Sequence, residues 1–182
     1  MNKLAFALAG SMMLALAAPF TPATATVETF EAKSAASEAA AMARADMADE
    51  FGVRALKPGR YLWKDGVPVR APRVVISLSD QMAYLYSANQ LVAVSTISSG
   101  KSGHDTPTGI FPILQKKPLH HSRKYDNAPM PFMQRLDDYG IALHAGALPG
   151  RPASHGCVRL PAKFAAKLYG VTKVGSTVMI GA

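Results

Sequence analysis

The stretch from Gly140 to Pro161, GIALHAGALPGRPASHGCVRLP, decides how this sequence of 182 residues is interpreted. It contains the only cysteine of the chain, Cys157, and two of the five histidines, His144 and His155. A lone cysteine has no partner for an intramolecular disulfide, so a structural cross-link within the chain does not account for it. The histidines close to it in sequence favour a reactive thiol.

A reactive thiol needs a base that takes its proton. His155 is two positions from Cys157, and in an extended turn its side chain would point elsewhere. His144 ends a short apolar strand, and the loop 145–153, with two glycines and two prolines, has the length to return onto Cys157. We therefore predict His144 as the base, with His155 and Ser154 shaping the turn. Gly156 would let the backbone approach a substrate.

From these residues alone, two alternatives to a reactive thiol stay open. A single buried cysteine is often an inert small hydrophobic residue. A zinc site would use Cys157 and histidines, but only one thiolate is available and no CxxC or HxxxH spacing supports it. We accordingly predict no metal and no other cofactor.

The first 25 residues predict export. Lys3 precedes an apolar run, Leu4 to Ala18, and Ala23-Thr24-Ala25 forms a small-x-small exit, the layout of a secretory signal peptide. The run is about fifteen residues long, short of the roughly 20 that a spanning helix needs. We expect cleavage near Ala25 and no integral membrane protein afterwards.

The charge balance predicts an anionic partner. Lys and Arg outnumber Asp and Glu by 20 to 12, which gives a formal net charge of +8. A positive surface attracts nucleic acid, anionic membranes and anionic cell-wall polymers alike. Export to the periplasm or cell envelope argues against nucleic acid and favours the wall polymer.

Four segments follow from the patterns along the chain: a signal peptide at 1–25, a spacer at 26–57, a short strand segment at 58–72 and the catalytic domain at 73–181. The spacer has high helix propensity, but its apolar residues are mostly alanine, so we expect a marginal helix or a flexible tether. The domain is predicted to be mostly β (α+β), with one or two short helices. Its strands are expected at 73–78, 82–86, 91–98, 110–114, 140–144 and 178–180, and its clearest helix at 161–169.

Residues 115–139 carry prolines, methionines and clustered polar side chains. This composition is not typical of a helix or a regular strand, and we predict an ordered loop that packs against another part of the domain.

The hexapeptide Ser154–Arg159, SHGCVR, preceded by His144, resembles the signature of the L,D-transpeptidase (YkuD-like) catalytic domain. Residues 75–86 resemble the opening hairpin of that family, and residues 98–101 and 106–111 resemble the loop and strand that follow it. The resemblance covers roughly residues 73–180.

This resemblance implies a β-sandwich or barrel domain that acts on peptidoglycan stem peptides in the periplasm. The Cys157 thiolate would attack the bond between the diamino acid and D-alanine of a tetrapeptide stem, and an acceptor amine would resolve the thioester. His144 would accept and donate the proton, and the backbone amides of Gly156 and Cys157 would form the oxyanion hole. Arg159 would steady the site or a substrate carboxylate, or form a structural salt bridge. A carbapenem is expected to react with the thiol.

Two further expectations follow. Relatives often carry Gly or Ser after the catalytic histidine, whereas this chain has Ala145, so a backbone carbonyl must orient the ring. The loop 115–139 would form one wall of the substrate-binding site. Its candidate substrate-binding residues, together with Ser154 and Arg159, are Met130, Phe132, Met133, Arg135, Tyr125 and Asn127; His120 and His121 are either solvated or part of the site.

The acceptor stays open. It could be a second stem, which gives a cross-link, or a wall-anchored protein. An L,D-carboxypeptidase that uses water and a non-catalytic wall-binding domain are the alternatives.

Overall fold

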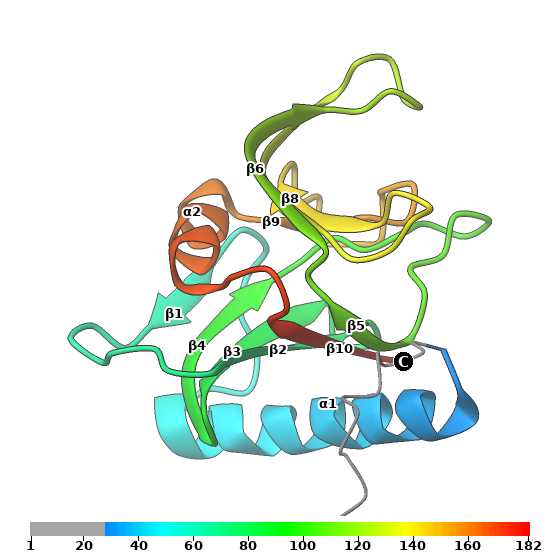
Figure 1. Ribbon diagram of the computed structural model, residues 1–182. Helices are drawn as coiled ribbons and strands as arrows, with labels where there is room; N and C mark the ends of the chain where they lie inside the picture. The colour runs from blue at the N-terminus through cyan, green and yellow to red at the C-terminus, as the bar shows by residue number, and fades with distance from the viewer. Residues whose placement is uncertain (1–27) are drawn as a thin grey trace, which may run out of the picture.

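The computed structural model describes residues 28–182, so the predicted signal peptide, residues 1–25, lies outside the described residues. Two β-sheets and two helices form the structure (Figure 1), which confirms the mostly-β prediction. Within the described residues, no helix combines the length and the apolar character needed to cross a membrane.

The first sheet has six strands in the order β1-β4-β3-β2-β10-β5. Their bounds are β1 Tyr61–Trp63, β2 Pro72–Ser77, β3 Met82–Ser87, β4 Gln90–Thr96, β5 Gly109–Pro112 and β10 Thr177–Gly181. Strands β2, β3 and β4 form the antiparallel meander that their branched residues predicted. The C-terminal strand β10 pairs parallel with β2 and antiparallel with β5.

Helix α1, Phe30–Phe51, lies across one face of this sheet (Figure 1). The sequence predicted a marginal helix or a flexible tether with little surface to pack. The helix is present, but it is not a tether, because its buried face packs against the sheet. The small side chains let the helix approach the sheet closely: a Cβ added to Gly181 of β10 would lie 2.6 Å from the Ala36 carbonyl oxygen. Its buried residues are Ala36, Ala39, Ala40, Ala43 and Met47.

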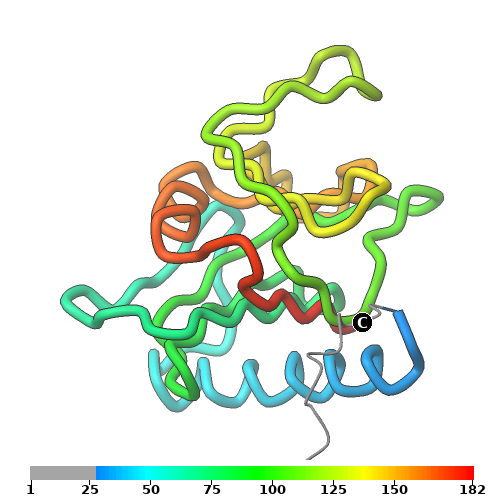
Figure 2. The backbone as a smooth tube through the Cα atoms, in the orientation of Figure 1, coloured from blue at the N-terminus to red at the C-terminus, as the bar shows by residue number. Residues whose placement is uncertain are grey.

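The second sheet has four strands in the order β6-β7-β8-β9. They are β6 Gln115–His121, β7 Pro129–Arg135, β8 Ala142–Ala145 and β9 Val158–Leu160. Strands β6 and β7 form a hairpin that rises away from the rest of the molecule (Figure 2).

This hairpin corrects the loop predicted for residues 115–139. Proline is tolerated where a strand has an unpaired edge. Pro118 lies on the edge strand β6, and β7 pairs with β8 only at Gln134 and Arg135, so Pro129 and Pro131 also lie where one edge is free.

The main core lies between the two sheets and under helix α2, Ala162–Val171. Phe164 of α2 packs against Tyr61 and Trp63, with ring centroids 5.7 and 5.8 Å away. The helix begins after Pro161, near the predicted position, but it continues through Gly170, which was expected to end it. The ammonium of Lys116 in β6 donates hydrogen bonds to the carbonyls of Tyr169 and Thr172. These carbonyls lie at the C-terminal end of α2, where the helix dipole favours a cation.

Candidate active site

The site is built on one face of the second sheet. Strands β8 and β9 run parallel, with Leu143 opposite Val158 and His144 opposite Arg159. Successive side chains of a strand alternate between faces. Leu143 and Val158 belong to the main core, so His144 and Arg159 lie on the opposite face of the sheet.

Cys157 directly precedes β9 and packs against Ala142, the residue before Leu143. It therefore shares the face of His144, displaced by one strand sideways and two residues along. With strands about 4.8 Å apart and a rise of about 3.3 Å per residue, this diagonal brings the two Cα atoms about 8 Å apart. Both side chains project from the same side, so the imidazole and the thiol can meet.

His144 is fixed by its own strand. Its side chain is 7% exposed, and Nδ1 lies 2.8 Å from the carbonyl oxygen of Ala145. An Nδ1–H donated to this carbonyl leaves Nε2 as the acceptor that faces the site. The orienting group is a backbone carbonyl, as the sequence predicted from the absence of a hydroxyl at Ala145.

Electrostatics keeps His144 neutral. Burial lowers the pKa of its imidazole, the hydrogen bond to Ala145 raises it in part, and the charges of Arg159 and His120 lower it further. The ring is therefore ready to accept a proton near neutral pH.

The Cys157 thiol is also neutral in the resting site. Burial raises its pKa, a hydrogen bond from the backbone N–H of Ala142 lowers it, the charge of Asp137 raises it, and that of Arg159 lowers it. The thiol donates a hydrogen bond to the Gly140 carbonyl at 3.5 Å. The free site thus holds a thiol and a neutral imidazole rather than an ion pair.

Gly156 has a conformation that only glycine adopts readily. Its φ is +108°, and an added Cβ would lie 2.7 Å from Cδ1 of Ile141. Its carbonyl accepts a hydrogen bond from the Thr106 hydroxyl at 2.8 Å, and its N–H donates to Oγ of Ser154 at 3.1 Å. Because the Gly156 N–H is already engaged, the amide of Cys157 is the remaining candidate of the two predicted for the oxyanion hole.

Ser154 has a different place from the substrate-binding one predicted. It is 1% exposed, and its hydroxyl donates to the Cys157 carbonyl while accepting from Gly156. Its backbone N–H donates to the Ser99 carbonyl at 3.0 Å. Ser154 therefore holds the turn around the thiol from inside and does not face a ligand.

His155 connects the turn to the tip of the hairpin. Its ring stacks on Tyr125 with centroids 4.5 Å apart, and its other neighbour is His104, at 4.6 Å. Tyr125, predicted to reach substrate, is instead held against His155. Asn127 follows it in the tip turn, with a φ of 53°.

The hairpin contributes two methionines beside the thiol, because Met130, Met133 and Cys157 form one cluster with Ala142. In a regular strand, Met130 and Met133 would point to opposite faces, since they are three residues apart. They share one face here because Phe132, which lies between them, has a φ of 57° that breaks the alternation. Phe132 is the neighbour of Met133 and points to the opposite face, toward Tyr169 of α2, with ring centroids 6.0 Å apart. The prediction that Phe132 lines the substrate site is therefore wrong.

Arg135 and Arg159 both lie on the thiol's face of the sheet. Arg135 is opposite Ala142, and its guanidinium donates to the Asp137 carbonyl at 2.8 Å and the Asp138 carboxylate at 2.9 Å. The Arg159 side chain lies along Gly146, where an added Cβ would come 2.9 Å from its Cγ. Among residues 28–182, no carboxylate forms a salt bridge with Arg159, so the structural ion pair left open by the sequence is not found there.

Comparison with protein-family models gives one match, to the L,D-transpeptidase catalytic domain (YkuD), over residues 71–180. The chain belongs to this family. The match covers all of the site described above, from the hairpin to the SHGC turn. No curated protein matches the chain.

Solved structures of L,D-transpeptidases share the fold. One from Mycobacterium smegmatis has 21% identity and a TM-score of 0.57, with 62% of this chain and 59% of that chain covered. One from Stackebrandtia nassauensis has 25% identity and a TM-score of 0.56, covering 64% and 57%. L,D-transpeptidase 3 of Mycobacterium tuberculosis, solved with a faropenem-derived adduct, has 20% identity and a TM-score of 0.57, covering 62% and 60%. The aligned part is thus less than two thirds of each of these relatives.

Two residues of this L,D-transpeptidase domain were missed or left open by the sequence. Asp137 accepts the Ile141 N–H at 2.8 Å and raises the pKa of Cys157, yet its motif, LDDYG, gives no signal of that position. His120, for which the sequence left a solvated role or a site role open, lies opposite Met130, and its charge lowers the pKa of His144.

Within residues 28–182 of the domain, no group of three or more His, Cys, Asp or Glu side chains is placed to hold a metal ion.

Proposed function

We propose that this chain is an exported peptidoglycan L,D-transpeptidase in which Cys157 is the nucleophile and His144 the general acid and base. The observation that carries the proposal is the shared sheet face of the two residues, together with the hydrogen bond that fixes Nδ1 of His144 to Ala145. Membership of the L,D-transpeptidase catalytic-domain family supplies the substrate class, the peptidoglycan stem peptide.

The first half-reaction forms a thioester. Nε2 of His144 takes the thiol proton of Cys157 while sulfur attacks the carbonyl carbon of the diamino acid, which is bonded to the nitrogen of D-alanine. The developing oxyanion is stabilised by the Cys157 N–H. The C–N bond then breaks, and the imidazolium returns the proton to the leaving amine of D-alanine.

The second half-reaction transfers the acyl group. An acceptor amine attacks the thioester, His144 takes a proton from its nitrogen, and the C–S bond breaks to give a new amide. The sulfur of Cys157 is the leaving group, and it receives the proton from His144 to become a thiol again. The acceptor is the amine of a second stem or of a wall-anchored protein in the periplasm.

The resting thiol and imidazole are both neutral, because burial lowers the pKa of His144 and raises that of Cys157. The proton therefore rests on sulfur in the free site, and His144 must take it for acylation to occur. Arg159 lowers the pKa of the thiol, and no carboxylate among residues 28–182 forms a salt bridge with it, so we assign it the binding of a substrate carboxylate close to the sulfur.

The test is incubation of the chain lacking residues 1–25 with tetrapeptide muropeptides, followed by mass spectrometry. A dimer formed with loss of D-alanine is the expected product. A tripeptide monomer alone would instead identify an L,D-carboxypeptidase, which uses water as the acceptor. Wall binding without any turnover would identify a non-catalytic binding domain and overturn the proposal.

A β-lactam gives a second readout. One solved relative carries a faropenem-derived adduct. We expect a carbapenem to add covalently to this chain and not to the Cys157→Ala variant. An adduct on the alanine variant would exclude Cys157 as the nucleophile.

A further inference from the structure

The register of the second sheet places four side chains in one row across the site. Lys117 of β6 is opposite Met133 of β7, and His144 of β8 is opposite Arg159 of β9. The pairing of β7 with β8 ends at Gln134 and Leu143, and Met133 and His144 are the next residues of these two strands beyond that pair. The row is therefore Lys117, Met133, His144, Arg159.

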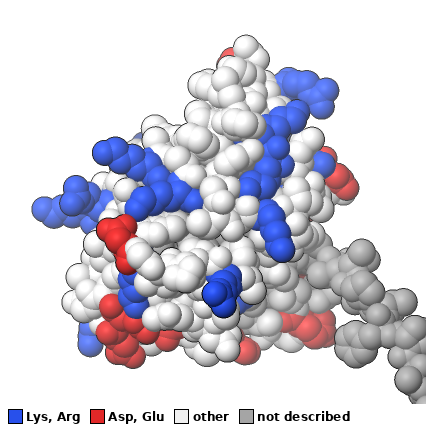
Figure 3. All heavy atoms as spheres, turned by 60° about the vertical axis from the view of Figure 1, so that its left-hand side comes forward, with Lys and Arg blue, Asp and Glu red and all other residues white. Residues whose placement is uncertain are grey.

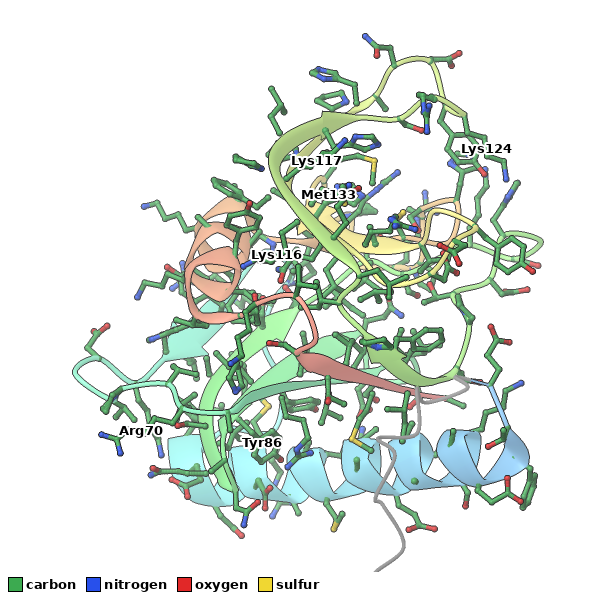
Figure 4. The ribbon with its side chains drawn as sticks, viewed as in Figure 1. Arg70, Tyr86, Lys116, Lys117, Lys124 and Met133 are labelled. Atoms are coloured by element: carbon green, nitrogen blue, oxygen red, sulfur yellow. The ribbon has the colours of Figure 1, made fainter. Side chains whose placement is uncertain are left out.

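All members of this row share one face of the sheet, because residues directly opposite each other in adjacent strands point to the same side. Met133 identifies the face, since it packs in the cluster with Cys157. Figure 4 shows Lys117 and Met133 at the hairpin, with Lys116 nearer to α2. The hydrogen bonds of Lys116 to the end of α2 agree with its position on the other face.

The two ends of the row are cationic and unpaired. Among residues 28–182, no carboxylate forms a salt bridge with Lys117 or Arg159. The Lys117 side chain is exposed, so its ammonium is available to a ligand. Within the described residues, Lys117 and Arg159 are thus cations without a salt bridge, and they lie on the two outer strands of this sheet, β6 and β9.

Lys117 lies close enough to His120 for its charge to act on that histidine. Burial lowers the pKa of His120, and the charges of Lys117, Arg123 and His121 lower it further. His120 in turn lowers the pKa of His144. Figure 3, in which the α2 side of the molecule comes forward, shows Lys and Arg mostly over the upper part of the molecule and Asp and Glu mostly along its lower edge.

We propose that Lys117 is a specificity residue that binds a free carboxylate of the donor stem from the β6 side of the site, opposite Arg159. This inference rests on the proposed function, because it takes a stem peptide as the donor. It goes further by assigning two separate cationic contacts to that donor, so the domain should prefer stems whose side-chain carboxylates are not amidated.

The test compares two tetrapeptide donors, one with a free side-chain carboxylate and one with that carboxylate amidated. For the wild-type chain we expect kcat/KM to be higher for the free acid by about tenfold, the size of one charge-assisted hydrogen bond. In Lys117→Gln the ratio of kcat/KM for the free acid to kcat/KM for the amidated donor should fall close to one, because kcat/KM falls for the free acid only. Lys117→Arg should keep most of the preference.

Lys163→Gln is the matched control, because Lys163 is an exposed lysine on α2, the helix that packs against the other face of the sheet. It should keep the wild-type ratio. A Lys117→Gln variant with the wild-type ratio, or a wild type that uses both donors equally, would overturn this inference and leave the transpeptidase intact. No turnover of either donor by the wild type would overturn the proposed function and the inference with it.

Discussion

The rings of Tyr125 and His155 stack with their centroids 4.5 Å apart and their planes 26° apart. Tyr125 lies at the tip of the β6–β7 hairpin, and His155 lies two residues before Cys157. The stack therefore fixes the free end of the hairpin to the turn that carries Cys157.

Removal of this stack should loosen the hairpin tip. An aromatic pair contributes about 0.5–1.5 kcal/mol beyond its buried area. In Tyr125→Ala we expect faster hydrogen exchange in residues 119–131 and a higher KM, with a smaller change in kcat. Tyr125→Phe keeps the ring and is the control; equal exchange in the alanine and phenylalanine variants would refute the role of the stack.

The reactivity of the thiol should depend on pH in a direction set by its surroundings. Burial and the Asp137 carboxylate raise the pKa of Cys157. The pH at which alkylation by iodoacetamide reaches half its maximal rate should therefore lie above the ordinary thiol pKa of about 8.5. Asp137→Asn removes one negative charge and keeps an acceptor for the Ile141 N–H, so it should lower this midpoint. A midpoint well below 8.5 in the wild type would contradict the neutral resting thiol.

Gly156 should not tolerate a side chain. Gly156→Ala combines an unfavourable φ of +108° with a Cβ 2.7 Å from Ile141. The strained φ alone costs about 1–3 kcal/mol, so we expect the unfolding free energy to fall by more than that amount. Gly59→Ala is the matched control, because its φ is +78° and nothing lies within 4 Å of the added Cβ. Urea unfolding measures both, and an equal loss in the two variants would show that the contact with Ile141 is unimportant.

Helix α1 should behave as a part of the folded domain. Ala43 is 0% exposed, so Ala43→Leu overfills the interface with the sheet and should cost about 1–3 kcal/mol of unfolding free energy. Ala41 is an exposed residue of the same helix, and Ala41→Leu should change stability by less than about 0.5 kcal/mol. A tether would show no difference between the two.

The sequence predicted those features whose signal is local. The branched runs in β2, β3 and β4 and the polar turns between them predicted the meander, and the SHGC turn with a histidine at the end of a strand predicted the site. The contribution of α1 could not be seen, because alanines form a buried face only where a partner such as Gly181 allows close approach.

The hairpin was missed for a related reason. Its prolines argue against a strand unless an edge is free, and the free edges of β6 and β7 depend on the pairing of the whole sheet. The shared face of Met130 and Met133 follows from one positive φ, at Phe132, which no composition reveals. The predicted substrate-binding role of Phe132 failed at that residue.

The pairing of Cys157 with His144 rather than with His155 is the central claim, and acylation of the protein tests it most directly. We would measure the intact mass of the wild-type, His144→Ala and His155→Ala chains during reaction with a tetrapeptide donor. We expect a thioester on the wild type, acylation at least about 100-fold slower in His144→Ala, and retained acylation in His155→Ala. Normal acylation of His144→Ala, with loss in His155→Ala, would contradict the pairing.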